Sequence, residues 1–370
     1  MNDPIEFGER AIALLDRAAV STSLKYALLL GLIELAHERT DSRGEPPDIV
    51  TTREIAMKVA ELYWPQTRAF TASHTGQSAV LKQSGTGQLA VVRQLGELRN
   101  LPSIKPTTTL TRAAALHPIH AERVLRRVEW SLIVDPLPRL QHVGTDAPFI
   151  YSVDWTSTEP GSSKNLPRAV VFLPGAGRHL QRLTALLRPL LERRWADYVA
   201  ARNSALLDYG RLDSHLFGQI RRPTGKLMTG LRDLQRGSCF YCRTPLSGAT
   251  AIDHFIPWSL HFDDGAFNLI ATHARCNGSK ADHLPAAVHV ERWVRRFAGS
   301  ERVGIEQLTK ATTWETNPAR TLSIARSVYA PLQPDSRLWI HGDSFEAADA
   351  KTILQLLAAA PAITEDDTNE

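Results

Sequence analysis

Apolar residues in the first part of the chain recur every three or four positions, which is the spacing of amphipathic helices. The repeat runs through residues 8–38 and returns, after a loop rich in Gly and Pro at 41–48, in "TTREIAMKVAELYW". Thr51 or Thr52 can cap this helix. A further amphipathic helix is predicted within "SAVLKQSGTGQLAVVRQLGELRN". We therefore expect a helix-rich N-terminal domain over residues 1–155, which is a plain helical bundle, a winged-helix-like DNA reader or a partner-binding module.

The middle of the chain combines short strand patterns with a long basic helix. "HAERVLRRVEWSLIVDPLPRLQHV" predicts a helix and then a strand, and the aromatic and β-branched residues of "PFIYSVDW" predict another strand. A linker rich in Ser, Gly and Pro is expected at 156–167, and "AVVFLPGAG" after it predicts a strand. Residues 168–226 are expected to form a basic helical region, with a break or kink at Pro189.

The last part of the chain has a cysteine-bearing segment at 227–297 and a small mixed region at 298–360. In the mixed region, "SVYAPL" and "RLWIHG" are candidate strands. Residues 361–370 are expected to form an acidic tail. Because short strand patterns are scattered among many helices, the chain predicts an α+β protein whose N-terminal and middle regions are mostly helical.

Composition places the chain among ordinary globular proteins. It has 370 residues, of which 43% are hydrophobic and 22% are charged, so it can build large cores. Its longest apolar run, "YALLLGLIELA", is too short to span a bilayer, and nothing resembles a signal peptide. Three cysteines do not make a disulfide framework. We therefore expect a protein without membrane contact in the reducing cytoplasm.

Positive charge is concentrated in the middle of the chain. The net charge is +4 with a pI of about 9.0, which permits a polyanionic partner without requiring one. Between Arg178 and Arg236 the chain carries twelve Lys and Arg against five Asp and Glu. Within this stretch, Arg188, Arg193 and Arg194 are candidate contacts to nucleic-acid phosphates, and a solvated helix face is the alternative.

The three cysteines fall into two short-spaced pairs that a histidine completes. Cys239 and Cys242 form the first pair, and His273 and Cys276 form a second pair with the same spacing about thirty residues later. Zn²⁺ is commonly held by thiolates and imidazoles delivered in such pairs, in a tetrahedral site without an open position. The pattern predicts a structural zinc site that stabilises the fold and takes no part in catalysis.

The residues around these pairs resemble the HNH, or ββα-metal, endonuclease family in its zinc-stapled form. The resemblance rests on the first cysteine pair and on the motifs Asp253-His254 with Pro257, Asn268-Leu269, and the helix opening "HARCNGSK". His273 stands where a cysteine is more usual, and imidazole is a good zinc ligand as well. The resemblance implies a small ββα nuclease core at 227–297, in the C-terminal half of the α+β chain.

The resemblance also implies how these residues act on a phosphodiester. The neutral imidazole of His254 would take the proton of the attacking water. Asp253 and Asn277 would hold one Mg²⁺ or Mn²⁺ ion through hard oxygen donors, with positions left for water and phosphate. Adjacent side chains of an extended strand point to opposite faces, which puts the metal and the activated water on different sides. Asn268 would order the loop around His254, and His283 is a weaker alternative to Asn277.

Other polar residues near the motif have less specific expectations. Lys280 lies three residues after Asn277 on the same helix face, where it either neutralises a phosphate or is solvated. Arg275 is a candidate phosphate contact. Ordinary structural roles are expected for four more residues: His261 and His289 at the surface, and Asp263 and Asp264 in a turn.

These features predict a metal-dependent endonuclease that hydrolyses phosphodiester bonds in DNA, with double-stranded DNA as the expected partner. One active site cuts one strand, so a double-strand break needs a homodimer, a second nuclease or a second visit. By analogy with other stand-alone nucleases, host defence, including phage defence, or restriction is the expected context. Two alternatives stay open. They are a nuclease subunit that a protein partner activates within a larger assembly, and a zinc-stapled nucleic-acid-binding protein that does not cleave.

Overall fold

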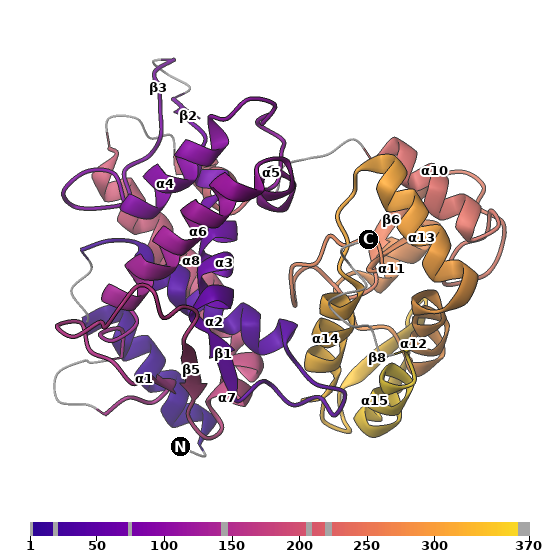
Figure 1. Cartoon of the computed structure of the whole chain (residues 1–370). Coiled ribbons are helices and arrows are strands. Elements are labelled where there is room, and N and C mark those ends of the chain that lie inside the picture. The colour runs from indigo at the N-terminus through magenta and orange to yellow at the C-terminus, as the bar shows by residue number, and fades with distance from the viewer. Residues whose placement is uncertain are drawn as a thin grey trace. The chain divides into compact units, whose positions relative to one another are not determined.

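The structure, a computed structural model, describes residues 3–17, 21–72, 76–141, 147–204, 209–218 and 224–361. The chain divides into two compact units, whose elements are labelled in Figure 1. The first unit comprises residues 1–36 and 47–222, and the second comprises residues 37–46 and 223–370. Helices dominate and the strands are short, which confirms the predicted α+β class.

The first unit packs its helices around one apolar helix. This helix, α2 (Leu24–Glu38), is buried along its whole length, as expected where apolar residues face every side. The other helices of the unit are α1 (Pro4–Arg17), α3 (Thr52–Tyr63), α4 (Ala90–Arg99), α5 (Leu110–Leu116), α6 (Pro118–Val134), α7 (Ala176–Arg182), α8 (Thr184–Arg202) and α9 (Tyr209–Leu216). Their buried apolar residues form one core. The segments 1–155 and 168–226, which we treated as separate regions, both contribute to this core.

Short strands complete the first unit. β5 (Ala169–Phe172) pairs antiparallel with β1 (Ile49–Thr51) on one side and with β4 (Tyr151–Ser152) on the other. β2 (Phe70–Thr71) and β3 (Ser78–Ala79) pair in a separate antiparallel ribbon. A short 3₁₀ helix, η1 (Pro65–Thr67), precedes them. Thr51 caps α3 in a capping box, in which its backbone N–H donates a hydrogen bond of 2.7 Å to the carboxylate of Glu54. This box explains why β1 ends and α3 begins at Thr51.

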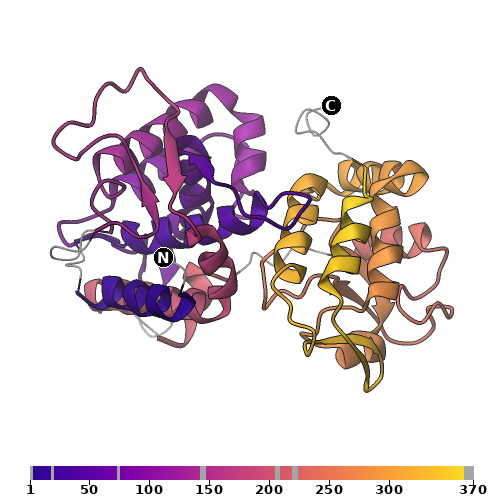
Figure 2. The same ribbon diagram turned by 90° about the horizontal axis from the view of Figure 1, so that it is seen from below.

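The second unit surrounds a β hairpin with helices. The hairpin strands are β6 (Thr250–His254) and β7 (Leu269–His273), and α11 (Ala274–Lys280) follows directly. The other elements are α10 (Gly225–Leu234), α12 (Ala287–Val294), η2 (Arg295–Phe297), α13 (Gly299–Thr312), α14 (Pro318–Tyr329), β8 (Arg337–His341), β9 (Ser344–Ala347) and α15 (Ala350–Ala358). The yellow α15 packs against α12 and α14, as Figure 2 shows from below. This unit has its own apolar core, in which the rings of Phe255 and Trp293 stack with centroids 4.6 Å apart.

Residues 37–46 lie early in the chain and nevertheless belong to the second unit. Nδ1 of His37 lies 2.6 Å from the hydroxyl oxygen of Ser327 on α14, and both side chains are buried. Gly44 has a φ of +85°, and a Cβ atom at this position would lie 2.6 Å from Cβ of Ala330. Only glycine therefore fits at the point where the segment approaches the end of α14.

The same segment is connected to the loop between β6 and β7. Glu38 forms an ion pair of 2.8 Å with Arg320 on α14. Arg320 also donates a hydrogen bond of 3.0 Å to Asp263 in the loop, and Thr321 donates one of 2.7 Å to the other carboxylate oxygen. Asp263 is buried and shapes its loop through these bonds. One arginine thus joins the segment 37–46 to the loop that follows β6, within the second unit.

Three local predictions differ from the structure. "SVYAPL" is not a strand, because its first residues complete α14, which Asn317 caps and whose apolar face is buried in the core. The strand expected after α6 is also absent from the described residues, since residues 135–141 form turns and 142–146 lie outside them. The long basic helix is interrupted at Leu183 and then runs through Pro189 without a break.

Candidate metal centre and active site

The hairpin fixes the register of the residues that the motifs single out. β6 and β7 pair antiparallel, with Asp253 opposite Ile270 and His254 opposite Leu269. His273 ends β7 and is the N-cap residue of α11, so Cys276 lies in the first turn of that helix. The first cysteine pair precedes β6 and is held against the hairpin, since the backbone N–H of Phe240 donates a hydrogen bond to Ala271 O.

The structure brings four potential metal ligands together. Ligand atoms of Cys239, Cys242, His273 and Cys276 all lie within 4.8 Å of one another. Nδ1 of His273 lies 3.4 Å from Sγ of Cys242, while its Nε2 lies 3.0 Å from the carbonyl oxygen of Pro245. A proton on Nε2 donated to this carbonyl leaves the lone pair of Nδ1 facing the sulfurs, which is the usual arrangement of a ligating histidine. Three sulfurs and one imidazole nitrogen are a donor set suited to a tetrahedral ion such as zinc.

The pKa values of two thiols in this group, Cys242 and Cys276, are shifted by their neighbours. Burial raises the pKa of Cys242, but hydrogen bonds from Thr244 and from the neighbouring ligands lower it more, to about 6. Burial and the sulfurs of Cys239 and Cys242 raise the pKa of Cys276 to about 12. Negative charges on adjacent sulfurs repel one another. A bound divalent ion removes this conflict, because it stabilises every coordinating thiolate.

His254 ends β6 and is partly open to solvent. Its side chain is 26% exposed, and its Nε2 lies 3.2 Å from Oδ1 of Asp264. Asp264 is itself 34% exposed, so it differs from the buried Asp263 beside it. The ring of Trp258 contacts the imidazole edge to face, with centroids 5.0 Å apart. We had assigned Asp264 only to the turn, and its contact with His254 arises from the hairpin loop folding back.

Asp253 lies beneath the surface beside a buried lysine. The Tyr241 hydroxyl donates a hydrogen bond of 2.6 Å to Asp253, and the Lys280 ammonium lies 3.3 Å from the carboxylate. Lys280 also donates a hydrogen bond of 2.9 Å to the carbonyl oxygen of His254. Burial raises the pKa of Asp253 and lowers that of Lys280, and in each case the partner's charge opposes the effect.

Lys280 therefore differs from its expected role at the surface. Its side chain is 1% exposed, so it is neither solvated nor available to a phosphate. A buried carboxylate needs a compensating charge, and Lys280 at the C-terminal end of α11 supplies it. The pair fastens α11 to the end of β6.

Two asparagines of the motif lie in different surroundings. Asn268 is fully buried, and its side chain bonds the backbone of the loop at Ile256 and Asp263. Asn277 is half-buried on α11, and within the described part of the chain its side-chain amide has no hydrogen-bond partner. An amide oxygen left without a protein partner, on a helix that packs against the strand carrying Asp253, is a donor suited to a hard cation such as Mg²⁺.

The remaining histidines near the motif differ in exposure. His261 and His289, which we expected at the surface, are buried at 1% and 4% exposure. Nε2 of His289 lies 2.7 Å from the carbonyl oxygen of Ile340, and burial lowers the pKa of this ring. His283, the weaker alternative to Asn277, is exposed, with its ring against Phe345.

The predicted phosphate-contacting arginines are distributed over both units. Arg275 is exposed on α11. The other three lie on α8 in the first unit, and each forms an ion pair with a carboxylate of that unit: Arg188 with Glu34, Arg193 with Asp197 and Arg194 with Asp16. Arg188 is the least exposed of them, and its pKa is raised although burial opposes this, because Glu34 and Glu192 are close. A phosphate would have to compete with these carboxylates.

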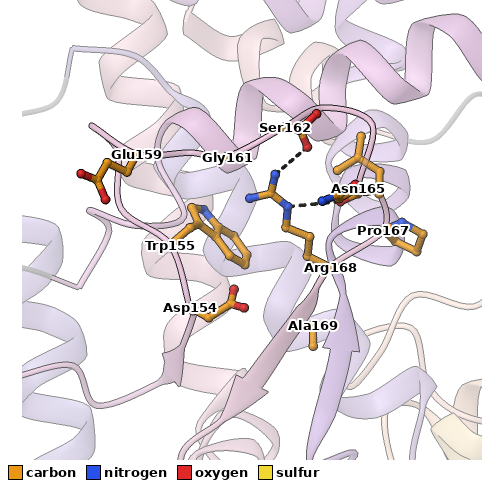
Figure 3. A pocket seen from close by; sticks show the side chains of 10 residues that line it. Asp154, Trp155, Glu159, Gly161, Ser162, Asn165, Pro167, Arg168 and Ala169 are labelled. Atoms are coloured by element: carbon orange, nitrogen blue, oxygen red, sulfur yellow. Dashed lines mark hydrogen bonds between the residues drawn. The ribbon is translucent and has the colours of Figure 1, made fainter.

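A separate cavity of about 570 Å³ lies in the first unit (Figure 3). Trp155 and Arg168 line it, together with several residues of the linker, among them Glu159, Ser162 and Asn165. The guanidinium of Arg168 donates hydrogen bonds to carbonyl oxygens of Pro160, Ser162 and Asn165 in that linker. Arg168 thus holds the linker in place with three hydrogen bonds, one from each of its nitrogens.

Comparison with known proteins identifies one segment of the chain. Residues 239–286 match the family model described as HNH endonuclease. The match runs from the first metal-ligand cysteine past α11, and it confirms the resemblance that the motifs indicate. No curated protein and no solved structure matches the chain. Among the residues that the structure describes, no helix has the length and apolarity needed to cross a membrane.

Proposed function

Because residues 239–286 form an HNH endonuclease domain, we propose that this protein is a metal-dependent endonuclease that hydrolyses phosphodiester bonds in DNA. One observation carries the proposal. His254 is partly exposed at the end of β6, and the unpartnered amide of Asn277 lies on α11, which Cys276 joins to the other three metal ligands. A general base and an oxygen donor are thus anchored to one rigid support.

The Cys239, Cys242, His273 and Cys276 group is proposed to bind structural zinc. All four donors come from the protein, which leaves no position for a substrate. Zinc here would lock the loop before β6, the end of β7 and the first turn of α11 together. Its contribution is therefore to the stability and geometry of the active site.

His254 is proposed as the general base. An ionised Asp264 can only accept a hydrogen bond, so Nε2 of His254 carries the hydrogen and Nδ1 keeps its lone pair for the proton of the attacking water. The negative charge of Asp264 then stabilises the imidazolium that forms. Asp264 acts through His254 and is a positioning residue.

Asp253 and Asn277 are proposed to hold the catalytic Mg²⁺ or Mn²⁺. When bound, the ion supplies positive charge to the phosphoryl oxygens and to the leaving group. Tyr241 and Lys280 hold the Asp253 carboxylate in place on the side of the protein interior. Asn268 keeps the loop after β6 closed through its backbone hydrogen bonds.

The proposal extends to the biological setting. A single HNH centre cuts one strand, so the expected product from a plasmid is a nicked circle. We place the activity in the cytoplasm and in host defence or restriction, by analogy with other stand-alone nucleases. Three cysteines, placed as metal-ligating thiols, suit a reducing compartment.

A plasmid assay tests the proposal. The purified full chain is incubated with supercoiled DNA in Mg²⁺, in Mn²⁺ and in EDTA, beside His254→Ala. Metal-dependent nicking that disappears in the variant is the expected result. Tight DNA binding without nicking by the wild type under every condition would overturn it, and would favour a binding protein or a subunit that needs an activating partner.

A further inference from the structure

Trp258 is an aromatic side chain left open to solvent beside His254. Its residue is 41% exposed, and it is the only aromatic among the exposed large apolar side chains of the described chain. The tryptophans at 64, 155, 195, 293, 314 and 339 are buried, and each uses its indole N–H in a hydrogen bond within the protein. A partly exposed indole beside the proposed general base offers surface on which a ligand can pack.

Two aromatic rings contact Trp258. Its ring meets Phe262 edge to face, with centroids 4.1 Å apart and planes at 77°. The His254 ring lies edge to face at 5.0 Å. Pro257, immediately before it, restricts the backbone three residues after β6 ends. The indole is therefore fixed in orientation without being covered.

We propose that Trp258 stacks on an unpaired nucleobase next to the scissile phosphate, whose attacking water His254 deprotonates, so that the preferred substrate is DNA with unstacked bases at the cleavage site. This inference rests on the proposed nuclease function and narrows its substrate. The Trp258 ring lies 5.0 Å from the His254 ring, so a nucleotide bound with its phosphate at His254 would bring its own base or a neighbouring base near the indole. Aromatic rings bind nucleic acid by stacking on base faces, whatever the base.

This contact can form only when the base is unstacked from its neighbours. In an intact duplex both faces of each base are covered by its neighbours, so an indole can reach a face only after the base has unstacked. A single strand or a bulged nucleotide offers a free face at no such cost. Trp258 should therefore distinguish opened DNA from intact duplex. An indole that only packed against His254 would not distinguish opened DNA from intact duplex.

Binding of matched DNA probes tests the inference on the full chain. His254→Gln serves as the non-cleaving background, and labelled DNA is offered as a single strand, an intact duplex and a duplex with one bulged nucleotide. Adding Trp258→Ala should weaken binding of the single strand and the bulged duplex about five- to 150-fold and leave intact duplex unchanged. Trp258→Phe should retain most of the affinity.

Val288 provides the matched control. It is an exposed apolar residue of the same unit, at 48% exposure on α12, and Val288→Ala should change none of the three affinities. Thermal midpoints of all variants check folding. Equal weakening for all three probes, or no weakening for any, would overturn the role of Trp258.

A second readout reports stacking directly. A fluorescent adenine analogue in the bulge should be quenched by the parent protein and by Trp258→Phe, and not by Trp258→Ala. These binding measurements need no cleavage. If the wild type fails to nick any DNA, the nuclease proposal fails while the probes still decide whether Trp258 stacks. If nicking occurs with equal affinity for the three probes, only the present inference fails.

Discussion

The ammonium of Lys280 lies 3.3 Å from the carboxylate of Asp253, and both side chains are almost completely buried. Each charge is costly in this position without the other. The pair spans the contact between α11 and the end of β6, next to the proposed general base. If Asp253 holds the catalytic ion as proposed, the same pair affects both stability and catalysis, and variants of the pair measure each effect.

Lys280→Met should destabilise the second unit, because it leaves Asp253 without its compensating charge. We expect a loss of about 3–5 kcal/mol in the free energy of unfolding at neutral pH. Chemical denaturation monitored by tryptophan fluorescence measures it. Arg275→Met, on the exposed face of the same helix, is the control and should cost little.

The loss in the free energy of unfolding caused by Lys280→Met should grow as pH rises. Burial raises the pKa of Asp253 above the value of about 3.9 that aspartate has in an unfolded chain. A group with a raised pKa contributes stability below its unfolded pKa and loses that contribution as pH rises through the folded pKa. Removing Lys280 raises the pKa of Asp253 further. The destabilisation should therefore be small near pH 4 and grow toward neutral pH, and a pH-independent loss would contradict this account.

The double variant Asp253→Asn/Lys280→Met removes both charges of the pair. It should be more stable than either single variant, since no unpaired charge stays buried. Nicking should not return, because Asp253 is also the proposed ligand of the catalytic ion. Unfolding curves and plasmid assays of the four proteins form a double-mutant cycle, and strictly additive losses of stability would show that the two charges do not interact.

His254→Ala should reduce the nicking rate by about 10²–10⁴-fold, which is the usual contribution of a positioned general base. Its side chain is partly exposed, so the thermal midpoint and the affinity for DNA should change little. Single-turnover rates on plasmid DNA measure the effect. Cutting at the wild-type rate would remove His254 from the reaction.

Asp264 variants test how His254 is oriented. Asp264→Asn keeps an acceptor oxygen for Nε2 and removes the charge, whereas Asp264→Ala removes both. We expect the rate to fall in the order wild type, Asn and then Ala, with unchanged affinity for DNA. Charge-assisted hydrogen bonds are about twice as strong as neutral ones, so the Asn variant should show a distinct intermediate rate. Equal rates for all three proteins would show that the contact with Asp264 has no part in catalysis.

Cys276→Ser should lower the zinc content and the thermal stability together, because metal binding contributes directly to folding in closed sites. Zinc per chain is measured by elemental analysis and stability by calorimetry. Ser279→Ala, on the same helix, is the control and should keep its zinc. A full equivalent of zinc in Cys276→Ser would exclude this cysteine as a ligand.

The sequence could predict what depends on short spacing. The paired ligands Cys239/Cys242 and His273/Cys276 each lie within one turn or loop, and the Asp253-His254 motif lies on one strand, so local pattern suffices to find them. The α+β class followed from the same local periodicities. Contacts between residues that loops and packing bring together could not be predicted from such local patterns.

The buried position of Lys280 depends on how α11 crosses β6, and helix spacing alone allowed a solvated face. The contact between Asp264 and His254 depends on the path of the loop between the hairpin strands. Trp258 carried no signal at all, because a tryptophan after a strand is usually buried. His261 and His289 were wrongly expected at the surface for a similar reason, since elements distant in sequence cover them.

The ten residues from His37 to Pro46 give the second unit a discontinuous construction. During synthesis this stretch leaves the ribosome long before Arg320 and Ser327, with which its side chains bond. These partners are absent until the residues through Ser327 have been translated. A gene fragment that begins at Pro223 would encode the HNH motif and omit a piece of the same folding unit. The boundary for expressing this half alone therefore cannot be drawn as a single cut in the chain.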